Sequence, residues 1–138
     1  LIMSAPGGKA KNAHSLALVE FVDIYPTLCE LCGLTPPDTL EGTSFAPLLD
    51  NPEALVKTAA FSQYPRSHNV MGYSMRTDRY RFTEWLDKDR KRIAKELYDH
   101  QEDPDENHNL AGRETMGEIV EALSVKMQAG WRGAVIGK

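Results

Sequence analysis

The chain has 138 residues, of which 41% are hydrophobic and 26% are charged, and this composition is ordinary for a globular protein with a core. The formal net charge of -4 argues against a nucleic-acid-binding protein, because neutralising phosphates takes a concentrated basic face. No apolar run approaches the roughly 20 residues that span a bilayer. Composition therefore predicts a globular protein that is neither a nucleic-acid binder nor a membrane anchor.

The first part of the chain predicts a strand and then a helix. Leu1–Ser4 reads as a buried strand entered midway, which indicates that the chain is part of a longer protein. Asp23 is a plausible N-cap, and Gly33 is the residue type that ends a helix. One face of this helix is predicted to pack on a core, because its apolar residues follow helical spacing: Ile24, Leu28 and Leu31.

Cys29 and Cys32 are the two cysteines, and their spacing has three interpretations. A zinc site would need two further ligands, and no second Cys-X-X-Cys or His-X-X-X-His pattern follows. A redox pair would stand at the N-terminus of a helix, whereas these residues precede the predicted helix end at Gly33. The preferred interpretation is two small apolar residues on adjoining helical turns.

Beyond about residue 55 the spacing of apolar residues changes from helical to alternating, which places a domain boundary there. Four runs alternate and predict strands: residues 59–64, 70–77, 80–86 and 93–99. Tight connections such as Thr77–Arg79 make them an antiparallel meander. A final amphipathic helix is indicated by Met116, Ile119, Val120, Leu123 and Met127. The predicted fold is α/β: a strand-helix piece in residues 1–55, then a four-stranded antiparallel sheet packed against a C-terminal helix in residues 56–138.

Residues 95–111 begin in the predicted last strand, continue as an acidic turn and lead into the last helix. Five residues in and after this stretch match ligand positions of an EF-hand calcium loop: Asp103, Asp105, Asn107, Asn109 and Glu114. However, His108 replaces the turn glycine of that motif, Pro104 stands at its second position, and a strand precedes it. The preferred interpretation is an acidic turn before a helix whose N-terminal dipole favours carboxylates.

Three residues are the candidates for binding a substrate: Arg66, His68 and Arg76. They stand among Tyr and small residues around a predicted loop, where binding residues are common. Arginine suits a sulfate, phosphate or carboxylate, because its planar guanidinium donates two hydrogen bonds to two oxygens. A structural ion pair is the alternative for Arg66 and Arg76. No His-Glu-X-X-His pattern or Gly-X-Ser-X-Gly elbow is present, so no catalytic triad is predicted.

Three signatures stand in an order that identifies a family: Val22–Leu28 with Gly33, then Gly42–Phe45, then Glu96–Asp99 with Asp103, Pro104, Glu106 and Asn109–Ala111. They resemble the Val-Asp-Ile-X-Pro-Thr-Leu helix, the Gly-X-Ser segment and the C-terminal signature of the sulfatases, in the alkaline phosphatase-like superfamily. Within that family, Ser62–Arg66, Met71–Thr77 and Tyr80–Thr83 look most like iduronate-2-sulfatase and its bacterial relatives.

The resemblance implies a parent enzyme that hydrolyses sulfate esters, on a glycosaminoglycan sugar, with a formylglycine made from cysteine and a bound calcium ion. It assigns residues 1–55 to the end of the catalytic domain and residues 56–138 to the C-terminal subdomain. Neither Cys29 nor Cys32 stands in the family's Cys-X-Pro-Ser-Arg, and the paired aspartate ligands belong upstream of Leu1. We therefore expect no catalytic residue, metal site or cofactor in this chain, and no sulfatase activity of the chain alone.

The partners implied by the resemblance are the upstream catalytic domain and a sulfated sugar, with Arg66, His68 and Arg76 contributing one wall of the substrate pocket. Two alternatives remain open: a non-catalytic module that binds sulfated glycans, and a structural or oligomerisation domain. The compartment expected by resemblance is periplasmic, secreted or lysosomal.

Overall fold

The computed structural model describes residues 1–136 and divides the chain into two compact units. The first unit comprises Leu1–Thr58 and the chain from Val135 onward, and the second comprises Ala59–Ala134. The division falls between Thr58 and Ala59, whereas the change in apolar spacing placed a boundary near residue 55. Within residues 1–136, no helix is long and apolar enough to cross a membrane.

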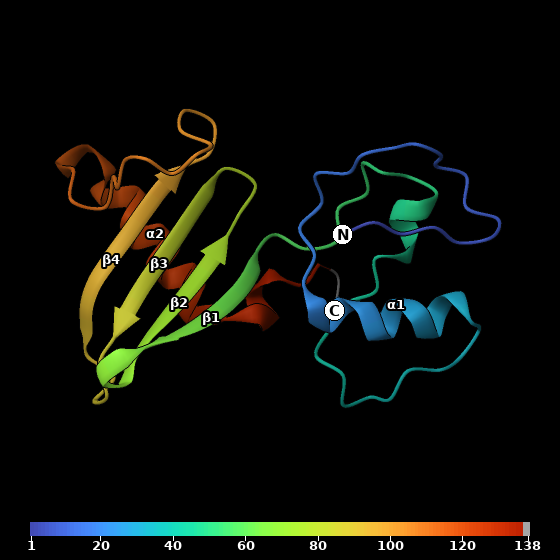
Figure 1. The fold of residues 1–138 in the computed structure, drawn as a ribbon, viewed down its shortest axis with the longest axis horizontal. Coiled ribbons are helices and arrows are strands. Elements are labelled where there is room, and N and C mark those ends of the chain that lie inside the picture. The colour runs from blue at the N-terminus through green and yellow to red at the C-terminus, as the bar shows by residue number, and fades with distance from the viewer. Residues whose placement is uncertain (137–138) are drawn as a thin grey trace. The chain divides into compact units, whose positions relative to one another are not determined.

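A four-stranded antiparallel sheet forms the second unit (Figure 1). Its strands follow chain order: β1 (Ala60–Arg66), β2 (Val70–Arg76), β3 (Tyr80–Leu86) and β4 (Arg92–Asp99). Thr77 closes the hairpin between β2 and β3, because its N–H donates to the Tyr80 carbonyl at 2.8 Å and its Oγ1 accepts from the Tyr80 N–H at 2.9 Å. The predicted antiparallel meander is confirmed.

The core of the second unit lies between the sheet and helix α2 (Gly117–Ala129), which lies on one face of the sheet (Figure 1). One residue from each strand contributes to a row that pairs across this face: Phe61, Met75, Phe82 and Leu97. The last three are fully buried, and α2 adds Val120 and Leu123 to the same core. The predicted amphipathic helix is therefore confirmed, because its apolar stripe is the part that meets the sheet.

Helix α1 (Ile24–Leu31) belongs to the first unit and ends where the sequence predicted. Gly33 has a φ of +67°, in the left-handed region that favours glycine after a helix, and the next N–H, of Leu34, donates to the Cys29 carbonyl at 2.8 Å. The remaining helical segments described are short 3-10 helices: Phe21–Asp23, Ala46–Leu49, Ser67–Asn69, Glu114–Met116 and Trp131–Ala134.

Asp23 stands at the predicted N-cap position of α1, but its side chain does not cap that helix. A 3-10 turn leads directly into α1, so Asp23 has a helical backbone and its side chain makes no cap hydrogen bond to the helix. The Asp23 carboxylate instead accepts hydrogen bonds from the Glu20 N–H at 2.7 Å and the Thr43 N–H at 2.8 Å. It therefore joins two segments of the first unit.

Two further expectations for the first unit are corrected. Leu1–Ser4 forms no strand, because a strand requires a hydrogen-bonded neighbour and no segment within residues 1–136 pairs with it. Leu28 and Leu31 do not pack on a core: they are 51% and 40% exposed. The face of α1 that is buried carries different residues: Pro26, Thr27 and Cys29.

A buried ion cluster connects distant segments of the first unit. The Lys57 ammonium lies 2.7 Å from Glu20 Oε2 and 2.8 Å from the Asp23 carboxylate. The side chains of Lys57 and Asp23 are only 4% and 0% exposed. Removing one partner would leave an unpaired buried charge at a cost of roughly 3–5 kcal/mol, so the burial of each charge depends on the others.

Candidate functional site

The face of the sheet opposite α2 carries polar side chains, and we call it the open face. Side chains that pair directly across the sheet share a face, and two polar rows cross this one: Ser62, Ser74, Thr83 and Glu96, then Arg76, Arg81 and Tyr98. A third row contains Tyr64, Gly72, Trp85 and Ala94. Figure 1 shows α2 on the other side of the sheet.

Arg66, at the end of β1, lies over two aromatic rings on the open face. Its guanidinium carbon is 4.7 Å from the centre of the Tyr64 ring and 5.2 Å from that of Trp85, which are cation-π distances. No carboxylate lies within ion-pair distance of Arg66 in the described part of the chain. The structural ion pair that was the alternative for Arg66 is therefore absent from residues 1–136.

Trp85 lies flat across β2 because its neighbour there is a glycine. A Cβ at Gly72 would stand 2.6 Å from the Trp85 ring, which no real contact tolerates. The indole N–H of Trp85 donates to Glu96 Oε1 at 2.9 Å. Glu96 also accepts from the Tyr98 hydroxyl at 3.4 Å, and burial, followed by the Glu96 charge, raises the pKa of Tyr98 above its usual value. Tyr98 therefore stays a hydrogen-bond donor at neutral pH.

A hollow of about 260 Å³ occupies the open face. Its lining comes from all four strands and the turn after β4: Ser62, Tyr64, Arg66, Gly72, Ser74, Arg81, Thr83, Trp85, Glu96, Tyr98 and Glu106. Two of its hydroxyls bond to each other, since Thr83 Oγ1 donates to Ser74 Oγ at 2.9 Å. The lining thus combines hydroxyl groups, aromatic rings and charged groups of both signs.

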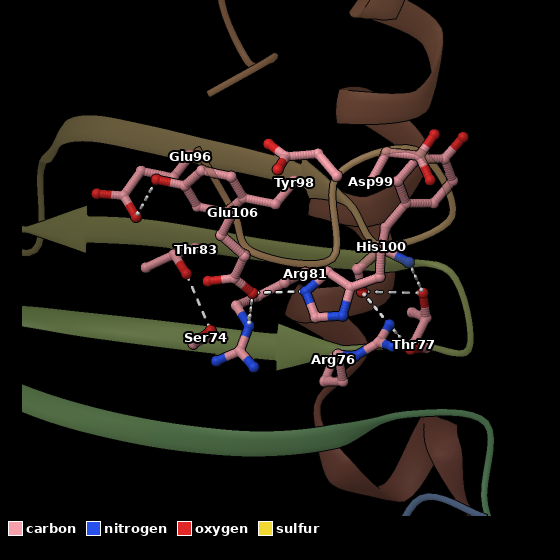
Figure 2. A network of polar contacts seen from close by, with 12 residues as sticks. Ser74, Arg76, Thr77, Arg81, Thr83, Glu96, Tyr98, Asp99, His100 and Glu106 are labelled. Atoms are coloured by element: carbon pink, nitrogen blue, oxygen red, sulfur yellow. Dashed lines mark hydrogen bonds and ion pairs between the residues drawn. The ribbon is translucent and has the colours of Figure 1, made fainter. Parts of the chain in front are cut away.

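Glu106 reaches the open face from the acidic turn and contacts two basic side chains (Figure 2). Glu106 Oε1 lies 2.6 Å from Arg81 Nε and 2.5 Å from His100 Nε2. Glu106 has a φ of 58°, which is unusual for a residue with a side chain. This backbone conformation and the two contacts together hold its carboxylate on the sheet.

The structure brings Arg66 and His68 to one end of the sheet and Arg76 to the other. Arg66 pairs with Val70 and Arg76 pairs with Ala60. Val70 and Arg76 are the two ends of β2, which is about 20 Å long at roughly 3.3 Å per residue. Arg76 donates to the carbonyls of Thr77 and Tyr80, and burial, with a smaller effect of Arg81, lowers its pKa. Arg76 therefore lies apart from the other two candidates.

His68 stands in the 3-10 turn Ser67–Asn69 that joins β1 to β2. Its φ of 62° is left-handed, its side chain is exposed, and its Nδ1 lies 3.1 Å from Ser67 Oγ. This position is next to Arg66 in the chain and open to solvent.

The carboxylate of Asp103 is hydrogen-bonded within the acidic turn. Asp103 accepts from the Asn107 side chain at 3.1 Å and the His108 N–H at 2.8 Å, and backbone hydrogen bonds lower its pKa. Within residues 1–136, no three His, Cys, Asp or Glu side chains gather as metal ligands. Cys29 is buried and Cys32 is exposed, each as a free thiol.

Several residues of the open face were not predicted. Tyr64 is two positions before Arg66 on β1, so the alternation of a strand places both on one face. Trp85 lies beside them because of the register of β2 against β3. Glu106 reaches the same face because the turn after β4 brings it to Arg81. Strand alternation could have identified Tyr64, whereas Trp85 and Glu106 required the three-dimensional structure.

The fold is that of a known domain class, the C-terminal domains of sulfatases. A family model described as "N-sulphoglucosamine sulphohydrolase, C-terminal" matches residues 1–132, and the chain belongs to this family. A crystal structure of a putative sulfatase from Bacteroides thetaiotaomicron superposes with a TM-score of 0.66 and 28% identity, over 78% of this chain and 23% of that one.

Curated relatives are similar over most of the chain. Arylsulfatase K of Mus musculus is 31% identical over 137 residues, covering 94% of this chain and 24% of the relative. Iduronate 2-sulfatase of Mus musculus is 30% identical over 156 residues, covering 80% of this chain and 28% of the relative. The chain thus spans about a quarter of the length of these relatives.

Proposed function

We propose that the chain is the C-terminal part of an enzyme that hydrolyses sulfate esters on a glycosaminoglycan-type sugar. The observation that carries this proposal is the family match over residues 1–132. Relatives named arylsulfatase K and iduronate 2-sulfatase support a sulfatase, and the second name supports a sulfated uronic acid as substrate.

Sulfate ester hydrolysis needs a nucleophile, a metal ion that stabilises developing charge, and basic groups around the sulfate. In the proposal, this chain supplies neither of the first two, and its part is to recognise the sugar. Arg66 and His68 are the residues suited to this, because both are exposed at one end of the sheet. Arg76 is a weaker candidate, because backbone carbonyls already engage its guanidinium.

The first unit provides the attachment to the rest of the enzyme in this proposal. Several of its large apolar side chains are exposed, including Phe21 at 89%, Leu28 at 51% and Leu31 at 40%. In this proposal a partner covers these side chains in the intact enzyme. The relatives are about four times as long as this chain. In this proposal, the upstream catalytic domain of the longer protein covers these apolar side chains.

The test uses the longer protein that contains this chain. We expect sulfate release from a disaccharide bearing a 2-sulfated uronic acid, and Arg66→Ala should raise KM roughly tenfold with a smaller change in kcat. Arg132→Ala is the matched control, because Arg132 also lies over a tryptophan ring, that of Trp131 at 4.3 Å, but does not line the hollow.

No sulfate release from any sulfated sugar by the longer protein would overturn the proposed activity. An Arg66→Ala variant with lower stability but unchanged KM would instead support a structural role for the sheet. The 138-residue chain alone should not hydrolyse an aryl sulfate.

A further inference from the structure

The hollow on the open face has the size and lining of a site for a single small ring. Its volume of about 260 Å³ is below the roughly 300–1,000 Å³ of sites for drug-sized ligands. Hydroxyl groups of Ser62, Thr83 and Tyr98 are on its lining, with the aromatic rings of Tyr64 and Trp85. Hydroxyls that exchange hydrogen bonds, beside flat apolar surfaces, match the two kinds of surface of a pyranose ring.

The two carboxylates of the lining are already engaged. Glu96 accepts hydrogen bonds from Trp85 and Tyr98. Glu106 contacts Arg81 and His100. Their charges are therefore partly compensated within the sheet.

Arg66 is the cation of the hollow that no carboxylate of the described chain neutralises. The Arg66 guanidinium carbon lies 4.7 Å from the centre of the Tyr64 ring and 5.2 Å from that of Trp85, and these rings offer no oxygen to its N–H groups, which can therefore bind the oxygens of a ligand. Tyr64 is 59% exposed, so a ligand can reach this end of the hollow. A guanidinium held between two aromatic rings is suited to a carboxylate or a sulfate.

We propose that the hollow binds one pyranose ring that bears an anionic group, with Arg66 binding the anion and the Tyr64–Trp85 pair contacting the ring. This deepens the proposed function and rests on it for the biological identity of the sugar. The binding itself is a property of this chain and requires no catalysis. Gly72 and Glu96 are positioning residues, because they keep the Trp85 ring flat and in place.

The two tryptophans of the chain permit a direct test by NMR. Only Trp85 lines the hollow, and Trp131 lies elsewhere in the second unit. Methyl glucuronide, which has a carboxylate, and glucosamine 6-sulfate, which has a sulfate, are titrated separately into the 138-residue chain. We expect the indole N–H signal of Trp85 to shift with at least one of them while that of Trp131 does not. The ligand that binds more tightly identifies the anion.

Variants connect the shift to the proposed contacts. Arg66→Ala should weaken binding about tenfold or more, and Arg66→Lys should restore only part of it, because an ammonium lacks the planar fork. Gly72→Ala should also weaken binding, because the new methyl group displaces the Trp85 ring. Arg132→Ala should bind as the wild type does. Thermal unfolding of each variant checks that the fold persists.

Three results would overturn the proposal: no shift of Trp85 with either ligand at tens of millimolar, an equal response to neutral methyl glucoside, or undiminished binding by a folded Arg66→Ala variant. If the longer protein is an active sulfatase and any of these results is found, only the proposed binding site in the hollow is rejected and the proposed enzyme stands. Binding by the chain without sulfatase activity of the longer protein would reject the proposed enzyme and keep the site.

Discussion

Asn109 shows how a signature residue acts at the scale of a single side chain. Its Oδ1 accepts from the Leu97 N–H at 3.0 Å and the Ala111 N–H at 2.9 Å, and its Nδ2 donates to the Lys95 carbonyl at 3.2 Å. The neighbouring Leu110 N–H donates to the Leu97 carbonyl at 2.8 Å. Together these bonds occupy the outer edge of β4, where an unpaired strand would invite pairing with another chain.

Replacing Asn109 with alanine should lower the free energy of unfolding by about 1–3 kcal/mol, because two backbone N–H groups and one carbonyl lose their partner. Urea unfolding measures this loss. Asn107→Ala is the control, since Asn107 lies in the same turn and donates one side-chain bond, to Asp103. An equal effect of the two substitutions would contradict the assigned role of Asn109.

Asp99 makes stability depend on pH. Its side chain is 2% exposed, and its carboxylate accepts hydrogen bonds from Arg79 Nε, at 2.9 Å and 3.1 Å, and from Arg79 Nη2, at 2.6 Å. The Arg79 hydrogen bond, opposed by burial and helped by the Gln101 N–H, lowers the pKa of Asp99. Because the pKa is lower in the folded than in the unfolded chain, the stabilisation exists above the unfolded value of about 3.9 and is lost as pH falls through the folded value.

Asp99→Asn should therefore reduce the acid sensitivity of the fold. Unfolding free energies at pH 6 and pH 3, measured in urea, should differ less for this variant than for the wild type. Asp105→Asn changes an exposed carboxylate in the turn and serves as the control. A difference between the two pH values that is as large in Asp99→Asn as in the wild type would show that the Arg79 pair is not responsible.

At the scale of the elements, the sheet and α2 form one core. The row of Phe61, Met75, Phe82 and Leu97 pairs across all four strands, and Val120 and Leu123 of α2 are buried in the same cluster. Alternation in the strands and helical spacing in α2 place these residues inward, which is why the sequence predicted the fold of the second unit well. Glu84 is the polar exception, because it accepts from Ser124 of α2 at 2.9 Å and lies 2.7 Å from Arg92.

Phe82→Ala should lower the free energy of unfolding by about 3–5 kcal/mol, because Phe82 is fully buried and its removal leaves a cavity. Ile93→Ala on β4 should change it by less than about 1 kcal/mol, because Ile93 is 54% exposed. Chemical denaturation of both variants gives the comparison. Similar losses would mean that the row does not form the core.

At the scale of the whole molecule, the two units differ in what holds them. The second unit has a continuous apolar core. In the first, α1 buries Pro26, Thr27 and Cys29 while Leu28 and Leu31 are exposed, and Lys57 bonds to two acidic residues. The first unit therefore depends strongly on a few polar contacts.

Lys57→Ala should destabilise the first unit by about 3–5 kcal/mol, since Asp23 would be left buried without its cation. Hydrogen exchange followed by mass spectrometry should show faster exchange in residues 20–31 and unchanged exchange in β2 and β3. Lys9→Ala, which removes an exposed pair with Asp50, is the control. Equally faster exchange in both units would show that they unfold together.

The candidate site was predictable only in part. Arg66, His68 and Arg76 stay predictions, made because arginine and histidine near a loop suit anionic ligands. The sequence did not show that the register places Arg76 at the other end of β2 from Arg66. Asp23 stands at the predicted N-cap position, but its carboxylate does not cap α1, because Lys57, which is distant in sequence, and the Thr43 N–H bind it. Such contacts have no local sequence pattern.

The sequence by itself determined the family, through signatures in a fixed order, and the sheet and helix of the second unit, through the periods of their apolar residues. These properties are local, since each depends on residues close together in the chain. Only the tertiary structure decided that Arg66 lies over Tyr64 and Trp85, and that no carboxylate within residues 1–136 pairs with it. That arrangement depends on strand register and on Gly72, because register sets which side chains of different strands meet.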